Sequence, residues 1–263
     1  MVEHEEPDGN PVLIEDRGPV RVVTLNRPAT LNASDEGLHT ALAEVWPAID
    51  AASEVRAVVL TGAGKAFSAG GDLALLDRMV ADPQLRAKVM AEAGAIVRGM
   101  TSVRVPIIAA VNGPAVGLGC SLAAMSDLVV IEEQAFLADP HVLLGLTAAD
   151  GGALVWPLLI SLQRAKEYIL LGDRIPAAEA LNLGLVNRVV PRGESVNTAV
   201  ELATRLAALP PQAVVESKKL INSGLRQAVA SLLSGGLDSE SRSFDEPAFQ
   251  QNLARMLSRT GAA

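Results

Sequence analysis

The sequence predicts an α/β protein with a helical C-terminal region. Short β-branched runs alternate with stretches of helical periodicity up to about residue 195, which is the pattern of an α/β domain. Beyond that point the pattern is purely helical. Three segments there lack strand character: 197–208, 211–233 and 237–258.

These patterns divide the 263 residues into three parts. We expect a flexible acidic N-terminus at 1–10, an α/β core at 11–195 and a helical region at 196–263. About 60 helical residues make a poor core alone. The helical region should therefore pack on the core or on a neighbouring subunit.

The chain begins with two predicted strands and a helix. Residues 11–16 and 20–25 are rich in β-branched side chains and flank Arg17-Gly18-Pro19, a turn signal. A helix should follow Ser34, because apolar residues then recur at helical spacing. These residues are Leu38, Leu42, Val45 and Ile49. We expect His39, in the same run, to lie at the surface.

A second series of elements follows. Residues 55–60 are a β-branched run that predicts a strand, and a glycine-rich loop then leads into a helical region from about 73 to 100. Residues 105–111 (VPIIAAV) carry no charge, which is typical of a strand buried on both faces. Two further strands are expected, at 128–131 and 186–190.

Charge and composition argue against several classes of protein. The net charge of −8 argues against nucleic acid binding, and seven aromatic residues leave little for base stacking. Residues 1–16 hold six of the acidic residues and no Lys or Arg, so the rest of the chain is nearly neutral. The single Cys120 excludes an intrachain disulfide and a multi-cysteine zinc site, and we predict no metal site.

The sequence also predicts a soluble cytoplasmic protein. The acidic N-terminus differs from a secretory signal, which is basic and then apolar. The 22 residues between Arg104 and Asp127 carry no formal charge and would be long enough to span a bilayer. Asn112-Gly113-Pro114 interrupts them, however, and breaks either regular element, so we predict no contact with a membrane.

Two glycine-rich loops are candidates for ligand binding. The loop at 62–72 is not a phosphate loop, because Ala66 follows Lys65 where Ser or Thr would be needed. It is compatible with a plain strand-to-helix turn. The loop at 112–120 also follows a buried strand. Two such loops could aim two backbone N–H groups at one oxygen, although its glycines could equally serve only close packing.

Several blocks together resemble the enoyl-CoA hydratase/isomerase, or crotonase, superfamily. The blocks are NRP at 26–28, LNA at 31–33, AFSAGGDL at 66–73, PIIAAVNGPAVGLGCSLAAMSD at 106–127, ADPHVLLGL at 138–146 and LGDRIPAAEALNLGLVNRVV at 171–190. The resemblance implies a crotonase-like superhelix of ββα units and a C-terminal helical trimerisation region. It also implies homotrimers that often pair into hexamers. The implied substrate is an acyl-CoA thioester, so coenzyme A enters as part of the substrate and no separate cofactor is expected.

The resemblance also implies particular site residues. The backbone N–H groups of Gly71 and Leu118 would form an oxyanion hole, where Leu118 replaces the family's usual glycine. The positions implied to contact substrate are Arg27, Ala33, Ala69, Gly70, Asp72, Leu73 and Ser121. The family's lysines for the CoA phosphates are absent. Their positions hold Ala29, Ala74 and Asn252, which leaves Arg27 as the nearest cation.

The two catalytic glutamates of the hydratases are also absent. Their positions hold Ser121 and His141. A serine hydroxyl does not titrate near neutral pH, whereas histidine is a competent base. Asp150 lies nine positions after His141 and could orient the imidazole if the intervening loop folds back. This pattern resembles the crotonase-fold β-diketone hydrolases, of which 6-oxocamphor hydrolase is an example, and implies that Glu240 assists.

Each of these residues also has a structural interpretation. Asp150 could cap a helix that starts near residue 152. His141 could be a satisfied histidine in a turn, and Ser121 could serve helix packing. Glu240 could lie on a solvated helix face.

Three functions are compatible with these interpretations of the site residues. The first is an enzyme that acts on an acyl-CoA thioester, with His141 and Asp150 in place of two glutamates. The second is a hydrolase that cleaves the C–C bond between two carbonyls. The third is a catalytically silent acyl-CoA binding protein.

Overall fold

The computed structural model describes residues 9–260. The expected flexible N-terminus lies almost wholly outside the described residues. Asn10 is within them, and its side chain accepts a hydrogen bond from the backbone N–H of Val12 at the start of the first strand.

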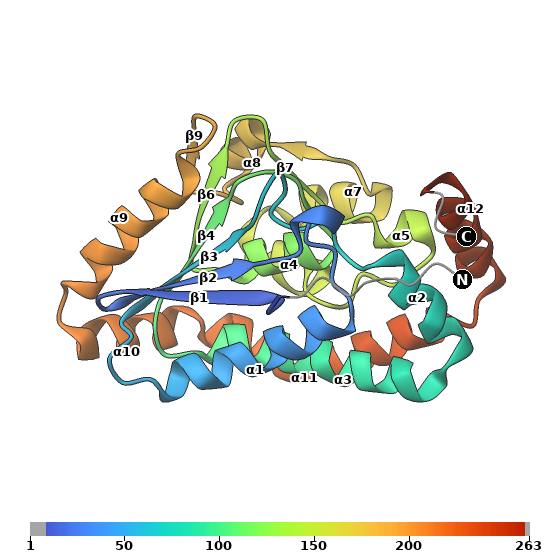
Figure 1. Ribbon diagram of the computed structural model, residues 1–263, viewed down its shortest axis with the longest axis horizontal. Helices are drawn as coiled ribbons and strands as arrows, with labels where there is room; N and C mark the ends of the chain where they lie inside the picture. The colour runs from blue at the N-terminus through green and yellow to red at the C-terminus, as the bar shows by residue number, and fades with distance from the viewer. Residues whose placement is uncertain (1–8, 261–263) are drawn as a thin grey trace.

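A six-stranded sheet forms the centre of the molecule (Figure 1). Only its first pair of strands is antiparallel; every later pair is parallel. In spatial order the strands are β1 (Val12–Arg17), β2 (Val20–Leu25), β3 (Ala57–Gly62), β4 (Ile107–Val111), β6 (Leu128–Glu132) and β9 (Arg188–Val190). Every residue of β3 and β4 is buried, as the uncharged sequence of β4 predicts.

A second sheet of three short strands lies next to the main one. It consists of β5 (Ala115–Val116), β7 (Phe136–Ala138) and β8 (Ile175–Pro176). A strand of the main sheet, a strand of this small sheet and a helix follow one another twice, from β4 and from β6. These are the ββα units that the family resemblance implies.

Eight helices belong to the core region. They are α1 (Glu36–Ala51), α2 (Leu73–Ala81), α3 (Pro83–Ser102), α4 (Leu118–Met125), α5 (His141–Leu144), α6 (Gly152–Leu159), α7 (Leu162–Leu171) and α8 (Ala177–Leu183). The helical region expected from 73 to 100 is two helices. Asp82 separates them, because its carboxylate caps α3 and Pro83 occupies the first position of that helix.

The C-terminal region is helical, as expected, but the boundaries between its last three helices differ from those of the expected segments. Its helices are α9 (Ser195–Ala207), α10 (Pro211–Ile221), α11 (Ser223–Ser243) and α12 (Pro247–Thr260). The expected segments 211–233 and 237–258 leave 234–236 between them, but the helix boundaries lie instead at Asn222 and at 244–246, and Gly235 and Gly236 lie inside α11. Leu233 and Leu237 are buried on either side of this pair, so tertiary packing outweighs the poor helix propensity of glycine.

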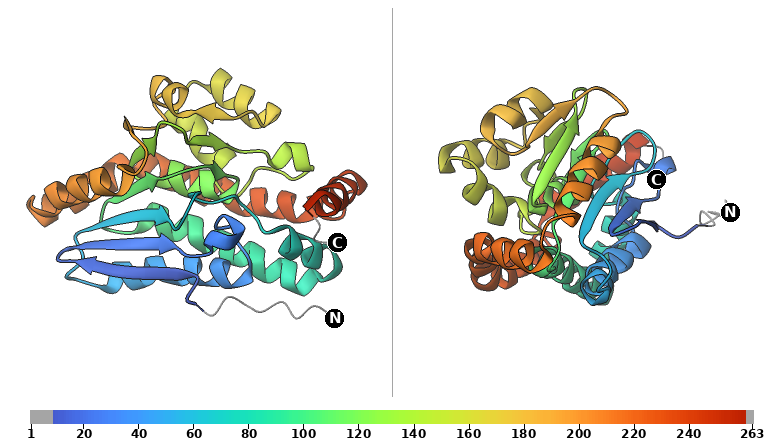
Figure 2. Two further views of the ribbon diagram at one scale, coloured as in Figure 1. Left: turned by 45° about the horizontal axis from the view of Figure 1, so that its top comes forward. Right: turned by 90° about the vertical axis from the view of Figure 1, so that its left-hand side faces the viewer.

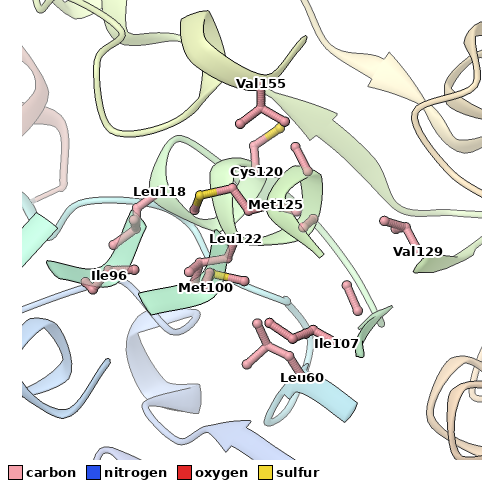
Figure 3. Close-up of a cluster of buried hydrophobic side chains, with 14 of the residues drawn as sticks. Leu60, Ile96, Met100, Ile107, Leu118, Cys120, Leu122, Met125, Val129 and Val155 are labelled. Atoms are coloured by element: carbon pink, nitrogen blue, oxygen red, sulfur yellow. The ribbon is translucent and has the colours of Figure 1, made fainter. Parts of the chain in front are cut away.

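The core fills both faces of the main sheet. On one face α9 packs against the central strands, through Ala199, Leu202 and Ala203 (Figures 1 and 2). On the other face lie α1, α3, α4 and α11, and Figure 3 shows part of this cluster, which includes Leu118 and the single Cys120. The C-terminal region therefore packs on its own core. Among the helices of residues 9–260, none combines the length and apolar character that crossing a bilayer requires.

Candidate active site

The two glycine-rich loops, 62–72 and 112–120, meet where the small sheet lies beside the main sheet. The backbone N–H of Val116 donates to the carbonyl of Ser68 at 2.9 Å, and that of Ser34 donates to Gly70 at 2.7 Å. Gly70 has a φ of +92°, and a Cβ placed on it would lie 2.9 Å from the carbonyl oxygen of Val116. Only glycine fits here, so the two glycine-rich loops touch through their backbones.

This contact brings the predicted oxyanion residues to the same place. Gly71 follows Gly70 directly, and Leu118 is the first residue of α4. Within residues 9–260, no backbone or side-chain acceptor takes the N–H of either residue. A free N–H in the first helical turn also carries the positive end of the helix dipole. The leucine at 118 leaves this backbone group available, because its side chain is buried in the core (Figure 3).

His141 stands beside this pair of loops at the start of α5. A Cβ placed on Gly117 would lie 3.7 Å from Cε1 of His141. Nδ1 of the imidazole contacts the Oδ1 atom of Asp139, and Nε2 lies 3.7 Å from Oδ2 of Asp150. The loop before α6 therefore does fold back, and His141 and Asp150 come together as the sequence required.

Asp150 is held from its other side by Ser121. The hydroxyl of Ser121, on α4, donates to Oδ1 of Asp150 at 3.1 Å. The alternative role for Asp150 as a helix cap is wrong, because Gly151 is the N-cap of α6 and no side chain caps that helix. Ser121 is buried, and a hydrogen bond to a site carboxylate goes beyond the packing role considered for it.

Glu240 completes the cluster from α11. Its side chain is buried, which corrects the alternative that it lies on a solvated face. The element α11 packs against α6, so this face of the helix points into the molecule. Among the described residues, its Oε2 atom has no hydrogen-bond partner. Burial and the charge of Asp150 raise the pKa of Glu240 to about 8.

The pKa of His141 moves in the same direction. Burial lowers this pKa, but neighbouring carboxylates, Asp150 first and then Asp139, outweigh burial, so the pKa lies well above its ordinary value. Burial also raises the pKa of Asp150, which His141 opposes. These shifts favour the protonated forms of His141 and Glu240, and the pKa of about 8 lets Glu240 exchange a proton near neutral pH.

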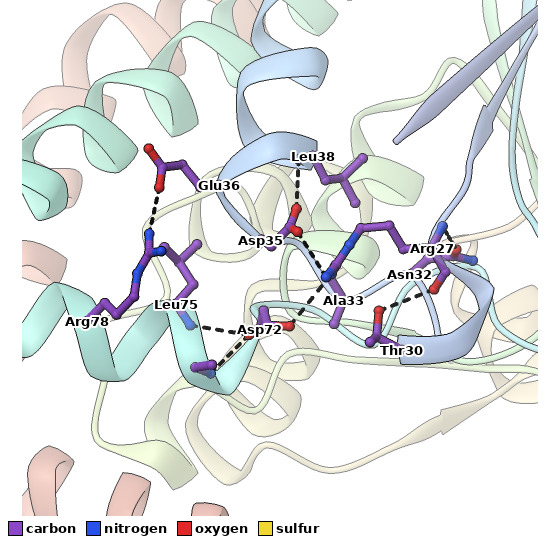
Figure 4. A network of polar contacts seen from close by, with 11 residues as sticks. Arg27, Thr30, Asn32, Ala33, Asp35, Glu36, Leu38, Asp72, Leu75 and Arg78 are labelled. Carbon is purple, nitrogen blue, oxygen red and sulfur yellow. Dashed lines mark hydrogen bonds and ion pairs between the residues drawn. The ribbon is translucent and has the colours of Figure 1, made fainter. Parts of the chain in front are cut away.

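The predicted substrate-contacting residues before α2 form a network of their own (Figure 4). The guanidinium of Arg27 donates to the carbonyl of Ala33 and pairs with Asp35 at 2.9 Å and with Asp72 at 3.6 Å. Asp72 also caps α2 through the N–H groups of Ala74 and Leu75. Arg27 is therefore occupied by protein groups and is not a free cation for a phosphate.

The other residues of this set line the loop by their backbones. The N–H of Ala69 donates to the carbonyl of Leu31 at 2.9 Å, and Leu73 opens α2. Asn32 organises the loop, because its side-chain amide donates to the carbonyls of Ala63 and Ala66 at 2.9 Å. Sequence reasoning gave Asn32 no role; its position in the LNA block is the signal that could have found it.

Asp139 is the other residue that sequence reasoning missed. It lies between β7 and His141, two positions before the histidine, and its side chain is buried. The signal was present in the tripeptide Asp-Pro-His, since an acid two positions from a histidine can reach it across a turn.

Comparison with known proteins gives a consistent result. A family model described as enoyl-CoA hydratase/isomerase matches residues 15–259. A short-chain-enoyl-CoA hydratase of Clostridium acetobutylicum is 38% identical over 218 residues, which are 82% of this chain and 83% of that protein. The crystal structure of an enoyl-CoA hydratase/isomerase from Mycobacterium paratuberculosis superimposes with a TM-score of 0.92 at 47% identity, and covers 94% of this chain and 98% of that one.

Proposed function

Because the chain belongs to the enoyl-CoA hydratase/isomerase family, we propose that it acts on an acyl-CoA thioester, with His141 and Asp150 as its proton-transfer groups. The observation that carries the proposal is the meeting of two free N–H groups, those of Gly71 and Leu118, with the His141 cluster. Coenzyme A is part of the substrate in this proposal, and no separate cofactor takes part.

The two N–H groups would polarise the thioester carbonyl. Negative charge develops on that oxygen as a nucleophile adds to the β-carbon or a proton leaves the α-carbon. Donors already aimed at the oxygen stabilise this charge without reorganisation, and one such donor is worth about 2.7–4 kcal/mol. Only backbone groups are needed, so the side chain at 118 does not enter the chemistry.

Hydration then requires one proton acceptor and one proton donor. Asp150 takes a proton from water as the water oxygen bonds to the β-carbon. His141, whose protonated form the neighbouring carboxylates favour, gives a proton to the α-carbon. The proton then passes from Asp150 to Nε2 across their 3.7 Å separation, which restores both groups. Isomerisation uses the same groups: Asp150 takes a proton from one carbon, His141 gives a proton to another, and the proton on Asp150 then passes to Nε2.

The test is the variant His141→Ala with a panel of enoyl-CoA esters, followed by mass analysis of the products. We expect the wild type to convert at least one ester and the variant to convert none. The variant should still fold, by circular dichroism, and still bind the ester, by calorimetry. Unchanged turnover in the variant would remove His141 from the mechanism.

A second candidate is the hydrolysis of a β-diketone, and two observations favour it. Glu240 is buried next to Asp150 and His141, and Arg27 is not free to bind a CoA phosphate. Here water activated by His141 and Asp150 adds to one carbonyl carbon. The bond from this carbon to the carbon shared by both carbonyls breaks, and that shared carbon takes up a proton. The products are a carboxylic acid and a ketone.

Two measurements separate the candidates. Calorimetry with free CoA should show binding under the first proposal and none under the second. Incubation with cyclic β-diketones should give ring-opened acids only under the second. A protein that binds an enoyl-CoA ester and leaves it unprocessed after long incubation would instead be the silent binding protein that the missing glutamates also allow.

We further propose that the chain forms a homotrimer, or a hexamer of two trimers, through its helical region. An apolar groove of about 780 Å³ supports this, lined by residues of α4, α6, α9, α10 and α11. Leu220 and Ile221 beside it are 73% and 80% exposed. Such an exposed apolar surface marks an interaction site. Light scattering should give a mass three or six times 27.3 kDa. The cytoplasmic location stays a prediction.

A further inference from the structure

We propose that Asp139 is the positioning residue that orients His141, and that Asp150 is thereby left to face the reacting atoms. The inference rests on the proposed use of His141 as a proton-transfer group. It reverses the role that the sequence suggested for Asp150, which was to hold the imidazole from behind.

The two ring nitrogens of His141 have different neighbours. Nδ1 is in direct hydrogen-bonding contact with Oδ1 of Asp139. Nε2 lies 3.7 Å from Asp150, which is longer than a hydrogen bond. A carboxylate on Nδ1 fixes that proton and leaves Nε2 as the nitrogen that gains and loses one. The geometry therefore places the exchangeable proton on the side of Asp150.

The backbone that carries Asp139 is better fixed than the backbone that carries Asp150. Asp139 follows β7 directly, and the carbonyl of Ala138, the last residue of that strand, accepts the N–H of Gly117 at 2.9 Å. Asp150 lies in the loop before α6. A group placed at the end of a strand holds its direction more accurately than one on a loop, which suits an orienting residue.

Asp139 has no other partner for its charge. Its side chain is 1% exposed, and within residues 9–260 its ion pair is with His141 and with no lysine or arginine. Its second oxygen, Oδ2, is buried and accepts no hydrogen bond from the described residues. A carboxylate buried in this way is costly unless it is paired. Asp139 and His141 therefore form a unit, and neither is satisfied without the other.

Gly152 provides the space for this carboxylate. A Cβ placed on Gly152 would lie 1.7 Å from Oδ2 of Asp139, so no other residue fits at the start of α6 while Asp139 keeps its position. This contact is independent of the histidine. It gives a second way to displace the carboxylate, by a change that leaves every titratable group of the site in place.

Asp150, by contrast, is held away from the ring. Its Oδ1 atom accepts from Ser121, which leaves Oδ2 directed toward Nε2 without a bond to it. Two groups this far apart can both contact one reacting atom that lies to one side of them, since each needs only about 2.8 Å to reach it. Asp150 is then a group that meets the substrate, whereas Asp139 acts through His141.

The test is the titration of the His141 imidazole, followed by NMR in protein without substrate. The variants are Asp139→Asn and Gly152→Ala, and Asp173→Asn is the matched control at an exposed position. We expect Asp139→Asn to lower the imidazole pKa by about one unit or more, because an opposite charge at this distance is removed. Gly152→Ala should lower it in the same direction. The other titratable groups that face the ring, Asp150 and Glu240 with Cys120 behind them, are unchanged in all three variants.

Turnover gives the second readout. Asp139→Asn should reduce kcat about 10²- to 10⁴-fold, with KM changed less than about threefold, since the orienting group does not touch substrate. An imidazole pKa unchanged in both Asp139→Asn and Gly152→Ala would overturn the inference. The titration needs no substrate, so it decides the role of Asp139 even if the proposed function fails. Should Asp139→Asn not fold, Gly152→Ala carries the test alone.

Discussion

Two buried histidines of this protein behave in opposite ways. The pKa of His39, on α1, is lowered to about 4 by burial, and only the charge of Asp35 opposes this. The pKa of His141 is raised, because carboxylates outweigh the same effect of burial. Burial of the two is similar: the residue His39 is 8% exposed and the side chain of His141 is 11% exposed. The difference therefore comes from the charges around each ring.

Neighbouring carboxylates and free N–H groups distinguish the candidate catalytic histidine from the other buried histidine. Nδ1 of His39 has no hydrogen-bond partner among the described residues, and the other buried residues of α1 are apolar. His141 has a carboxylate on each side and two free N–H groups beside it. The sequence expectation that His39 lies at the surface was wrong, since its place between Leu38 and Leu42 matched a buried helix face.

The largest difference between the two histidines should appear in turnover. His141→Gln should reduce kcat/KM by about 10³-fold or more, because proton transfer is lost. His39→Leu should leave kcat/KM within about twofold of the wild type, since His39 lies outside the site. Steady-state rates of both variants with one substrate test this directly. A comparable loss in both variants would abolish the distinction.

The second prediction concerns stability in acid. His39 binds a proton more weakly in the folded protein than in the unfolded chain, where its pKa is near the ordinary 6.5. Its contribution to stability is therefore complete above pH 6.5 and is lost as the pH falls toward 4, by up to about 3 kcal/mol. Urea unfolding of the wild type and His39→Leu at pH 7 and pH 4.5 measures this. Equal pH dependence in both proteins would contradict it.

The third prediction concerns the pH dependence of the rate and the charge of Glu240 near His141. The carboxyl of Glu240 loses its proton near pH 8 and then adds a charge beside Asp150. Because the ionised carboxyl of Glu240 opposes the ionised form of Asp150 that takes the proton from water, the kcat/KM of the wild type should fall above this point, by up to about tenfold. Glu240→Gln is neutral at every pH, so its rate should stay level from pH 7 to pH 9. The same fall in the variant would assign the ionisation to another group.

The smallest effect concerns the helices that carry the two histidines. His39 lies within the 16 residues of α1, whereas α5 has four residues and its carbonyls need outside donors. The side-chain amide of Asn252, on α12, donates to the carbonyls of Leu143 and Leu144 at 3.3 Å and 3.1 Å. Asn252→Ala should lower the free energy of unfolding by about 1 kcal/mol and change kcat only slightly. Asn222→Ala serves as the comparison in the same denaturation experiment, because it also removes a side-chain amide hydrogen bond but lies far from the site.

Most of the fold was predictable from local patterns, and much of the site was not. The α/β class and the family resemblance are confirmed, and the strand at 20–25 has the predicted bounds. The break at Asp82 was also readable, because Asp-Pro favours the start of a new helix. The burial of Glu240 depends on how α11 packs against α6, and no pattern within α11 contains that contact.

The partners of His141 also show that local sequence patterns do not determine which side chains meet in the folded site. The resemblance directed attention to Asp150, and the structure does bring it near the ring. The contact with Asp139 depends on the turn at Pro140, which aims two side chains of the same short segment at each other. Sequence spacing predicts which residues can meet, whereas the direction of each side chain is decided by the packing of the whole site.

The space that Gly152 leaves for Asp139 gives a rule for sorting related chains. A relative with a side chain at the position of Gly152 cannot hold an aspartate at the position of Asp139 in the same pose, since a Cβ would lie 1.7 Å from its oxygen. Chains that carry Asp-Pro-His should therefore keep glycine eleven positions after that histidine. The aspartate two positions before the histidine and the glycine eleven positions after it would then distinguish relatives with this histidine arrangement from those that keep the two glutamates.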